Sequence, residues 1–183
     1  CLTAEQLEEA ITPNTKLLML CTPNNPTGSV YTYENLKAIV EVLNKHPQII
    51  VLADEIYQHI LYTGKHETLA QFPEVQDRLI IINGVSKAYA MTGYRIGWLA
   101  CHDKDFITAV KRLQGQTISC ATTIAQKAAE AAYSGPQECV EEMRQAFQRR
   151  RDLIVKLAKE IPGFEVNNPQ GAFYLFPKCD SFF

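Results

Sequence analysis

Three short apolar runs alternate with helical patterns in the first half of the chain. The runs Lys16–Cys21, Gln48–Ala53 and Arg78–Asn83 are almost continuously apolar, which is typical of strands buried on both faces of a parallel sheet. After the first run, apolar residues recur at the spacing of an amphipathic helix, at Leu36, Ile39, Val40 and Leu43. Strands that alternate with helices in this way predict a doubly wound, mostly parallel α/β sheet.

The remaining pattern predicts one more strand and several helices. A capping box formed by Thr3 and Gln6 indicates a short helix over residues 3–11. The run 96–101 is a candidate fourth strand, and apolar residues at helical spacing follow it. An alanine-rich helix is expected over residues 122–133.

A long helical pattern begins at Gln137 and keeps one apolar face for about 25 residues, a length that can bridge two domains. We therefore place a domain boundary near residue 140. Residues 1–140 are expected to form part of a larger domain. Residues 141–183 are expected to form the linking helix and the first part of a smaller α+β domain, in which 164–166 and 172–176 pair as a hairpin of short strands.

Composition and charge narrow the range of functions. With 18 Lys and Arg against 20 Asp and Glu, the net charge is −2, so the basic surplus that binds nucleic acid or an anionic membrane is missing. No apolar run approaches the roughly 18 residues that span a bilayer, and the N-terminal residues lack a signal-peptide pattern. The six cysteines form no CxxC pair, and the four histidines have no metal-site spacing. We expect a cytoplasmic protein with no metal, nucleic-acid or membrane partner.

Polar residues follow each of the three predicted parallel strands. Asn24–Gly28 follows the first and Asp54–Tyr57 closes the second; Ser86 and Lys87 follow the third, with Arg95 further on. Ligands of parallel α/β sheets bind beyond the carboxyl ends of the strands. An amide, a carboxylate, a phenol, an amine and a guanidinium are therefore expected at one edge of the sheet.

One common cofactor matches this set of groups. A carboxylate such as Asp54 at the end of an apolar strand needs a cationic partner. A lysine can form a Schiff base with an aldehyde, and an arginine can hold a phosphate through two hydrogen bonds. Pyridoxal phosphate carries an aldehyde, a protonatable ring nitrogen, a phenolic oxygen and a phosphate, and proteins bind it with a lysine and an acidic residue. The inventory therefore points to pyridoxal phosphate.

Four ordered segments carry a resemblance to a known family. They are Asn-Asn-Pro-Thr-Gly at 24–28, Asp-Glu-Ile-Tyr at 54–57, the segment 86–97 that begins Ser-Lys-Ala-Tyr, and, more weakly, Pro-Gln-Gly-Ala-Phe-Tyr at 169–174. In order and spacing they resemble those of fold-type I pyridoxal phosphate enzymes, specifically class I aminotransferases close to the bacterial aspartate aminotransferases. The similarity covers nearly the whole chain.

The resemblance implies roles for the residues around the cofactor ring. Lys87 would bind the cofactor covalently and move a proton between the substrate α-carbon and the cofactor. Asp54 would pair with the ring nitrogen and keep it protonated. Tyr57 and Asn25 would hydrogen-bond the ring oxygen and stabilise its anionic form.

The phosphate side departs from the family pattern. Members often have a serine three residues before the lysine, where this chain has Gly84, so Arg95 and Ser86 would carry more of the phosphate binding. By the resemblance, a phosphate loop, a ring that stacks on the cofactor, a tyrosine from a partner subunit and an arginine for the substrate carboxylate lie outside these residues. We expect the middle of a longer homodimeric enzyme, inactive by itself.

The activity that the resemblance implies is ping-pong transfer of an amino group between an amino acid, aspartate above all, and a 2-oxo acid. Two other functions stay open. One is a pyridoxal phosphate-dependent carbon–sulfur β-lyase, which shares the lysine and the aspartate. The other is a non-catalytic, aminotransferase-like effector domain of a transcription regulator.

Each candidate also has an ordinary explanation. Asp54 is of a type common at helix caps and turns, Arg95 could form a surface ion pair, and Ser86 could be structural. Glu55 is expected on the opposite face of the strand from Asp54 and in a structural role.

Overall fold

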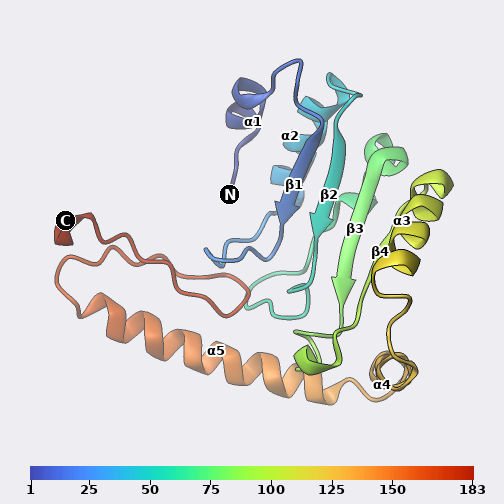
Figure 1. Cartoon of the computed structure of the whole chain (residues 1–183). Helices are drawn as coiled ribbons and strands as arrows, with labels where there is room; N and C mark the ends of the chain where they lie inside the picture. The colour runs from blue at the N-terminus through green and yellow to red at the C-terminus, as the bar shows by residue number, and fades with distance from the viewer.

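Four strands form one mixed sheet in the order of the sequence. The computed structural model describes all 183 residues. β1 (Leu17–Cys21), β2 (Ile50–Asp54) and β3 (Leu79–Gly84) are parallel, and β4 (Gly97–Ala100) pairs with β3 in the antiparallel direction. The order is β1-β2-β3-β4 (Figure 1). The predicted α/β class with a mostly parallel sheet is therefore confirmed.

Two capped helices cover one face of this sheet. α1 (Ala4–Ala10) begins at the predicted capping box of Thr3, and α2 (Tyr33–Asn44) begins at a second box formed by Thr32 and Asn35. Such boxes satisfy backbone N–H groups that have no partner in the first helical turn. Buried side chains of both helices pack with alternate residues of the strands to form the main core.

Two short 3₁₀ helices complete this core. η1 (Leu69–Gln71) and η2 (Pro73–Arg78) connect the turn after β2 to β3 and contribute buried apolar side chains. The Arg78 guanidinium donates to the carbonyls of Leu43 and His46 at 2.9 and 2.7 Å. It thereby joins the end of η2 to the C-terminal turn of α2 and the residues that follow it.

The opposite face of the sheet is largely exposed at β1 and β2. Leu17, Met19 and Ile50 point to this face, and Met19 is 64% exposed. The expectation that these strands are buried on both faces is therefore wrong. The helices that contribute to the main core all lie on the other side, so alternate residues of the strands stay uncovered.

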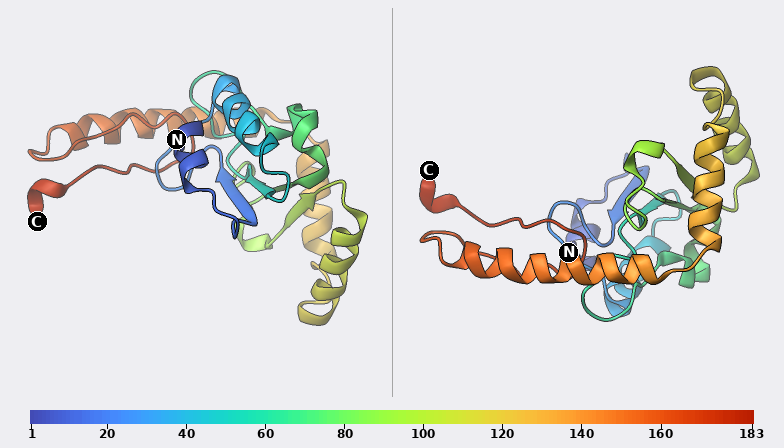
Figure 2. Two further views of the ribbon diagram at one scale, coloured as in Figure 1. Left: turned by 90° about the horizontal axis from the view of Figure 1, so that it is seen from above. Right: turned by 90° about the horizontal axis from the view of Figure 1, so that it is seen from below.

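Three further helices follow the sheet. They are α3 (Lys104–Thr117), α4 (Thr123–Ser134) and α5 (Glu138–Lys159), and α3 buries none of its residues. α5 is the predicted long helix. The chain after it runs back along the helix to the edge of the sheet and then returns outward to the short η4 (Asp180–Phe182) (Figures 1 and 2). The domain boundary near residue 140 stays a prediction.

The hairpin expected near the C-terminus does not form strands. Two isolated antiparallel bridges are present, and neither joins 164–166 to 172–176. Backbone groups of residues 170–172 instead pair with residues 60–62, in the turn region after β2. Glu165 pairs with Lys178 instead of with 172–176, so residues 170–172 attach to the end of the sheet and the expected register does not form.

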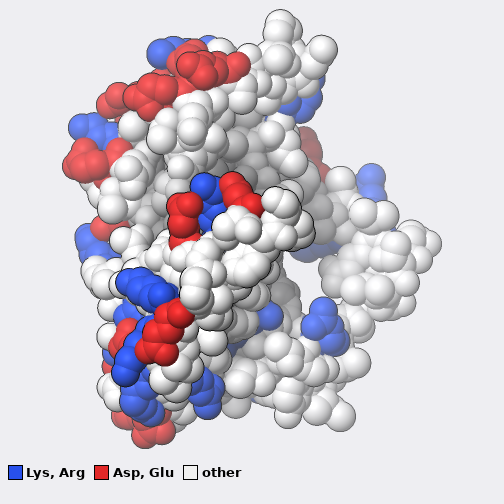
Figure 3. All heavy atoms as spheres, turned by 90° about the vertical axis from the view of Figure 1, so that its left-hand side faces the viewer, with Lys and Arg blue, Asp and Glu red and all other residues white.

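Charge is mixed on the face that Figure 3 presents. Blue and red side chains alternate along one border of this face, and most of the remaining surface is uncharged. None of the helices combines the length and the apolar character needed to cross a membrane.

Leu43 tests the main core. It is fully buried on α2, so Leu43→Ala should lower the free energy of unfolding by about 2–5 kcal/mol through lost burial and a residual cavity. Glu41→Ala on the exposed side of the same helix should change it by less than about 0.5 kcal/mol. Urea titration followed by circular dichroism checks both values, and equal losses would show that α2 does not pack as described.

Candidate active site

The carboxyl ends of β1, β2 and β3 meet at one edge of the sheet. The strand register pairs Cys21 with Asp54 and Asp54 with Ile82. The turns that carry Asn25 and Lys87 leave from the ends of the neighbouring strands at this edge (Figure 1). The site is therefore built from turns whose starting points the sheet fixes.

Asp54 is half-buried at the last position of β2. Its Oδ1 accepts a hydrogen bond from the backbone N–H of Ile56 at 3.1 Å, an Asx turn that starts the bend after the strand. Glu55 lies buried on the other side, where its carboxylate accepts from the Thr68 hydroxyl and lies 3.2 Å from His66 Nε2. The alternation expected for these two carboxylates is present, and Glu55 anchors the turn within the fold.

Tyr57 is the most deeply buried of the predicted site residues. It is 3% exposed, and its hydroxyl shares a hydrogen bond with the hydroxyl of Tyr174. Burial raises the pKa of Tyr57 far above its ordinary value, and the Tyr174 hydrogen bond and the negative charge of Asp54 act in the same direction. Tyr57 is therefore a neutral phenol that can donate one proton near neutral pH.

Lys87 lies in the turn that follows β3. The flanking residues Val85 and Ala88 are buried and fix the turn, while Lys87 itself is half-buried. Its Nζ lies 5.7 Å from the ring centroid of Tyr57 and 5.7 Å from that of Phe173. The structure thus brings the predicted amine and the predicted phenol together, with a second aromatic ring beside them.

Asn25 lies in the turn after β1 and is exposed. Its backbone hydrogen-bonds the Cys21 sulfur, which opposes the rise that burial causes in the pKa of this thiol. The neighbouring Asn24 holds the turn, since its Oδ1 accepts from the backbone N–H and the hydroxyl of Thr27 at 3.2 and 2.7 Å. The structure places Asn25 in the turn after β1, at the same edge of the sheet as Asp54, and its side chain makes no hydrogen bond to Lys87 or Tyr57.

The predicted phosphate residues make no hydrogen bond to Lys87 or Tyr57, although Ser86 directly precedes Lys87 in the same turn. Ser86 is half-buried, and its hydroxyl makes no hydrogen bond within the chain. Arg95 is exposed, has a left-handed φ of 55°, and donates from Nη1 to the Thr92 carbonyl at 3.0 Å. It directly follows the short η3 (Thr92–Tyr94). Arg95 makes no hydrogen bond or ion pair with the other predicted residues, and it precedes the strand that pairs with the end of β3.

A segment from the far end of the chain completes the site. Residues 169–172 lie between the turn after β1 and the turn after β2, since Gln170 and Gly171 donate backbone N–H groups to the Gly28 carbonyl at 2.8 and 3.0 Å. The Arg151 guanidinium holds the same segment through the Pro169 carbonyl at 2.6 Å. Phe173 and Tyr174 are thereby carried to Tyr57 and Lys87.

The sequence did not assign Phe173 and Tyr174 to the site. Their rings pack on Tyr57 edge to face, with centroids 5.4 and 5.7 Å away. The only signal for them was the weak motif over residues 169–174, which carried no role. Aromatic residues near a chain end are usually part of a core, so no local pattern separates these two from ordinary packing residues.

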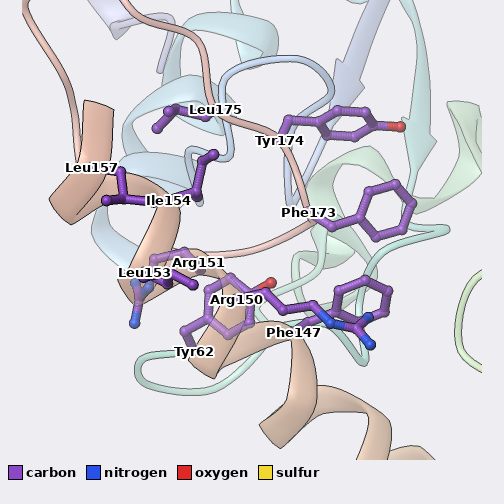
Figure 4. A pocket seen from close by; sticks show the side chains of 10 residues that line it. All are labelled: Tyr62, Phe147, Arg150, Arg151, Leu153, Ile154, Leu157, Phe173, Tyr174 and Leu175. Atoms are coloured by element: carbon purple, nitrogen blue, oxygen red, sulfur yellow. The ribbon is translucent and has the colours of Figure 1, made fainter. Parts of the chain in front are cut away.

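An apolar cavity of about 390 Å³ adjoins this segment. It lies between α5 and residues 173–175, and the side chains in Figure 4 line it. These are Tyr62, Phe147, Arg150, Arg151, Leu153, Ile154, Leu157, Phe173, Tyr174 and Leu175. Phe173 and Tyr174 therefore border both the cavity and the candidate active site.

Comparison with known proteins places this arrangement in a family. The profile of the aminotransferase class I and II family matches residues 1–182. The aspartate aminotransferase of Geobacillus stearothermophilus is 51% identical over 97% of this chain and 45% of its own length. The aspartate/prephenate aminotransferase of Cereibacter sphaeroides is 48% identical over 96% of this chain and 44% of its own length.

Solved structures agree. The crystal structure of the aspartate aminotransferase from Rhizobium meliloti superposes with a TM-score of 0.93 at 44% identity, over 98% of this chain and 45% of that one. An aromatic aminotransferase from Pyrococcus horikoshii gives a TM-score of 0.92 at 35% identity, over 97% and 48%. The chain thus spans a little under half the length of the relatives it matches.

Gly28 tests how the C-terminal segment is attached. Its φ is +67°, and a Cβ there would lie 2.4 Å from Pro169 Cβ. Gly28→Ala should therefore lower the free energy of unfolding by about 2–4 kcal/mol, from the left-handed backbone and from overpacking. Gly64 has a φ of +69° with no atom within 4 Å, so Gly64→Ala should lose only about 1–2 kcal/mol.

Chemical denaturation of the two variants checks this difference. A loss for Gly28→Ala no larger than that for Gly64→Ala would mean that Pro169 does not lie against Gly28.

Proposed function

The chain belongs to the aminotransferase class I and II family, and on that premise we propose that it is the central part of a longer pyridoxal phosphate-dependent aminotransferase. The proposed enzyme takes the amino group of aspartate, passes it to a 2-oxo acid by a ping-pong route, and works as a cytoplasmic homodimer. The observation that carries the proposal is the position of Lys87, whose Nζ lies 5.7 Å from the ring centroids of both Tyr57 and Phe173.

The side chains at this edge fit pyridoxal phosphate in chemical type. The Lys87 amine suits the aldehyde, the Asp54 carboxylate suits the ring nitrogen, and the phenol of Tyr57 and the amide of Asn25 suit the ring oxygen. When bound, the cofactor supplies an electron-accepting ring for the electron pair left by the substrate α-proton.

Lys87 is the proposed general base and acid. Its neutral amine takes the α-proton of the substrate and returns a proton later in the cycle. The faces of the neighbouring rings, 5.7 Å from Nζ, limit the positions that the amine can take.

Asp54 and Tyr57 act on the electron distribution of the site. The Asp54 carboxylate is fixed by the Ile56 N–H at 3.1 Å and favours a positive charge at the ring nitrogen. The Tyr57 hydroxyl would donate a hydrogen bond to the ring oxygen of the cofactor and stabilise negative charge there.

The phosphate is assigned to Ser86 and Arg95. The Ser86 hydroxyl is free of hydrogen bonds within the chain. Arg95 uses one Nη1 bond for the Thr92 carbonyl, and a guanidinium has five N–H donors. Both therefore retain donors for an anion.

The activities after which the relatives are named support the substrate choice. The Geobacillus stearothermophilus and Rhizobium meliloti proteins are named aspartate aminotransferase. The carbon–sulfur β-lyase and the transcriptional effector domain are not favoured, because these relatives at 45–51% identity are named as aminotransferases.

Lys87 gives the direct test. The full-length protein with pyridoxal phosphate should show a visible absorption band, and borohydride reduction followed by peptide mapping should place the label on Lys87. Lys87→Ala should lose the band and the label, since no other amine is available at this position. Lys37→Ala, at an exposed position of α2, should keep both. A label on another lysine in the wild-type protein would contradict the assignment.

Asp54 tests the electronic role. Asp54→Asn keeps the shape of the side chain but removes its charge, so turnover of aspartate with 2-oxoglutarate should fall on the order of 10²-fold or more. Asp77→Asn removes an exposed carboxylate and should leave turnover unchanged. Steady-state kinetics of the two variants gives the answer; similar rates in both would remove Asp54 from the mechanism.

A further inference from the structure

Two tyrosines that are 117 positions apart in sequence meet inside the candidate active site. The hydroxyls of Tyr57 and Tyr174 share a hydrogen bond, and their rings pack edge to face with centroids 5.7 Å apart. Tyr57 is almost completely buried, and Tyr174 is the one side chain that hydrogen-bonds its hydroxyl. Tyr174 is therefore the protein group that determines where the Tyr57 hydroxyl points.

The hydrogen bond between the two hydroxyls can run in either direction. Each hydroxyl has one proton to donate and two lone pairs that accept. When no ligand is present, the Tyr57 hydroxyl can donate its hydrogen bond to the Tyr174 oxygen. When the Tyr57 hydroxyl instead donates its hydrogen bond to a ligand oxygen, the Tyr174 hydroxyl can rotate and donate a hydrogen bond to the Tyr57 oxygen.

We propose that Tyr174 is a positioning residue: it orients the Tyr57 hydroxyl and donates a hydrogen bond to it when Tyr57 donates to an anionic oxygen of the bound ligand. The inference rests on the proposed function, in which that oxygen is the ring oxygen of pyridoxal phosphate. Hydrogen bonds in a chain polarise one another, so the second hydroxyl makes Tyr57 a stronger donor.

The surroundings of Tyr57 support a neutral, directed phenol. Lys87, Asp54, Cys21 and Tyr174 are the titratable groups that face it. Burial raises the pKa of Tyr57, and the charges of Cys21 and Asp54 raise it further. The phenol therefore keeps its proton near neutral pH. The orientation of the Tyr57 O–H bond then decides whether it can donate a hydrogen bond to a bound ligand.

Backbone hydrogen bonds to Gly28, Ile60 and Tyr62 hold the segment that carries Tyr174. The Tyr62 hydroxyl donates to the Ala172 carbonyl, two residues before Tyr174. The Tyr62 hydroxyl makes no hydrogen bond to the Tyr57 hydroxyl, and the backbone bonds of the segment do not depend on it. It provides a matched control, because Tyr62→Phe also removes one buried hydroxyl from this region.

The first experiment measures the visible band of pyridoxal phosphate bound to the full-length protein as a function of pH. Removing the second hydroxyl makes the anionic ring oxygen less stable. Tyr174→Phe should therefore move the midpoint of the spectral transition upward by about 0.4–1 pH unit, the equivalent of one net hydrogen bond. Tyr62→Phe should leave the midpoint unchanged.

The second experiment uses the protein without cofactor. With Tyr carrying ¹³C at Cζ, the NMR signal of Tyr57 reports its protonation directly. In the wild-type protein the hydrogen bond from the Tyr57 hydroxyl to Tyr174 stabilises the neutral phenol. Tyr174→Phe removes this bond, so the pKa of Tyr57 should fall. Tyr62→Phe should not change it. The two experiments thus predict shifts of opposite sign from one substitution, which a loss of packing alone would not produce.

A double variant separates action through Tyr57 from direct action on the ligand. In a Tyr57→Phe background, Tyr174→Phe should cause no further shift of the visible band.

The proposal is wrong if Tyr174→Phe leaves both signals unchanged, if Tyr62→Phe produces the same shifts, or if the shift persists without the Tyr57 hydroxyl. A wild-type protein that shows no visible band would instead refute the proposed function, while the NMR experiment would still report on the hydroxyl pair.

Discussion

The parallel register of β1, β2 and β3 determines where every group of the candidate site begins. Cys21 pairs with Asp54 and Asp54 with Ile82, so the turns after the strands start side by side. A slip of one residue in β2 would turn Asp54 toward the main core and Glu55 toward the site. The buried contacts of Glu55 with Thr68 and His66 oppose that slip.

A second constraint joins the end of the chain to this edge. Residues 169–172 share backbone hydrogen bonds with Gly28 on one side and with residues 60–62 on the other. Only a residue without a side chain fits at Gly28, because Pro169 lies where a Cβ would be. The aromatic environment of Lys87 is therefore made by two regions that are distant in sequence, and it exists only while the segment is attached.

The local patterns predicted the elements well for identifiable reasons. Continuous apolar runs, capping boxes and helical spacing are short-range signals, and they located β1 to β4 and the five α-helices to within a few residues. The carboxyl-end rule then brought Asp54, Tyr57 and Lys87 to one edge, because in a parallel sheet the strand order alone sets the position of the turns.

Other features depended on long-range contacts that no local pattern contains. The apolar residues of β1 and β2 were expected to be covered on both faces, yet Met19 is exposed because coverage depends on which helices pack there. The pattern over 164–176 predicts a hairpin, but the backbone of residues 170–172 pairs with the turn after β2. The parts played by Phe173 and Tyr174 follow from that pairing, so the sequence pattern gave them no role.

A crystal structure of the full-length protein grown with pyridoxal phosphate tests the central claim most directly. The account predicts continuous electron density from Lys87 Nζ to the cofactor, with the Asp54 carboxylate at the ring nitrogen and the Tyr57 hydroxyl at the ring oxygen. Density for the cofactor at another lysine, or a ring that lies beyond the reach of Asp54 and Tyr57, would contradict it.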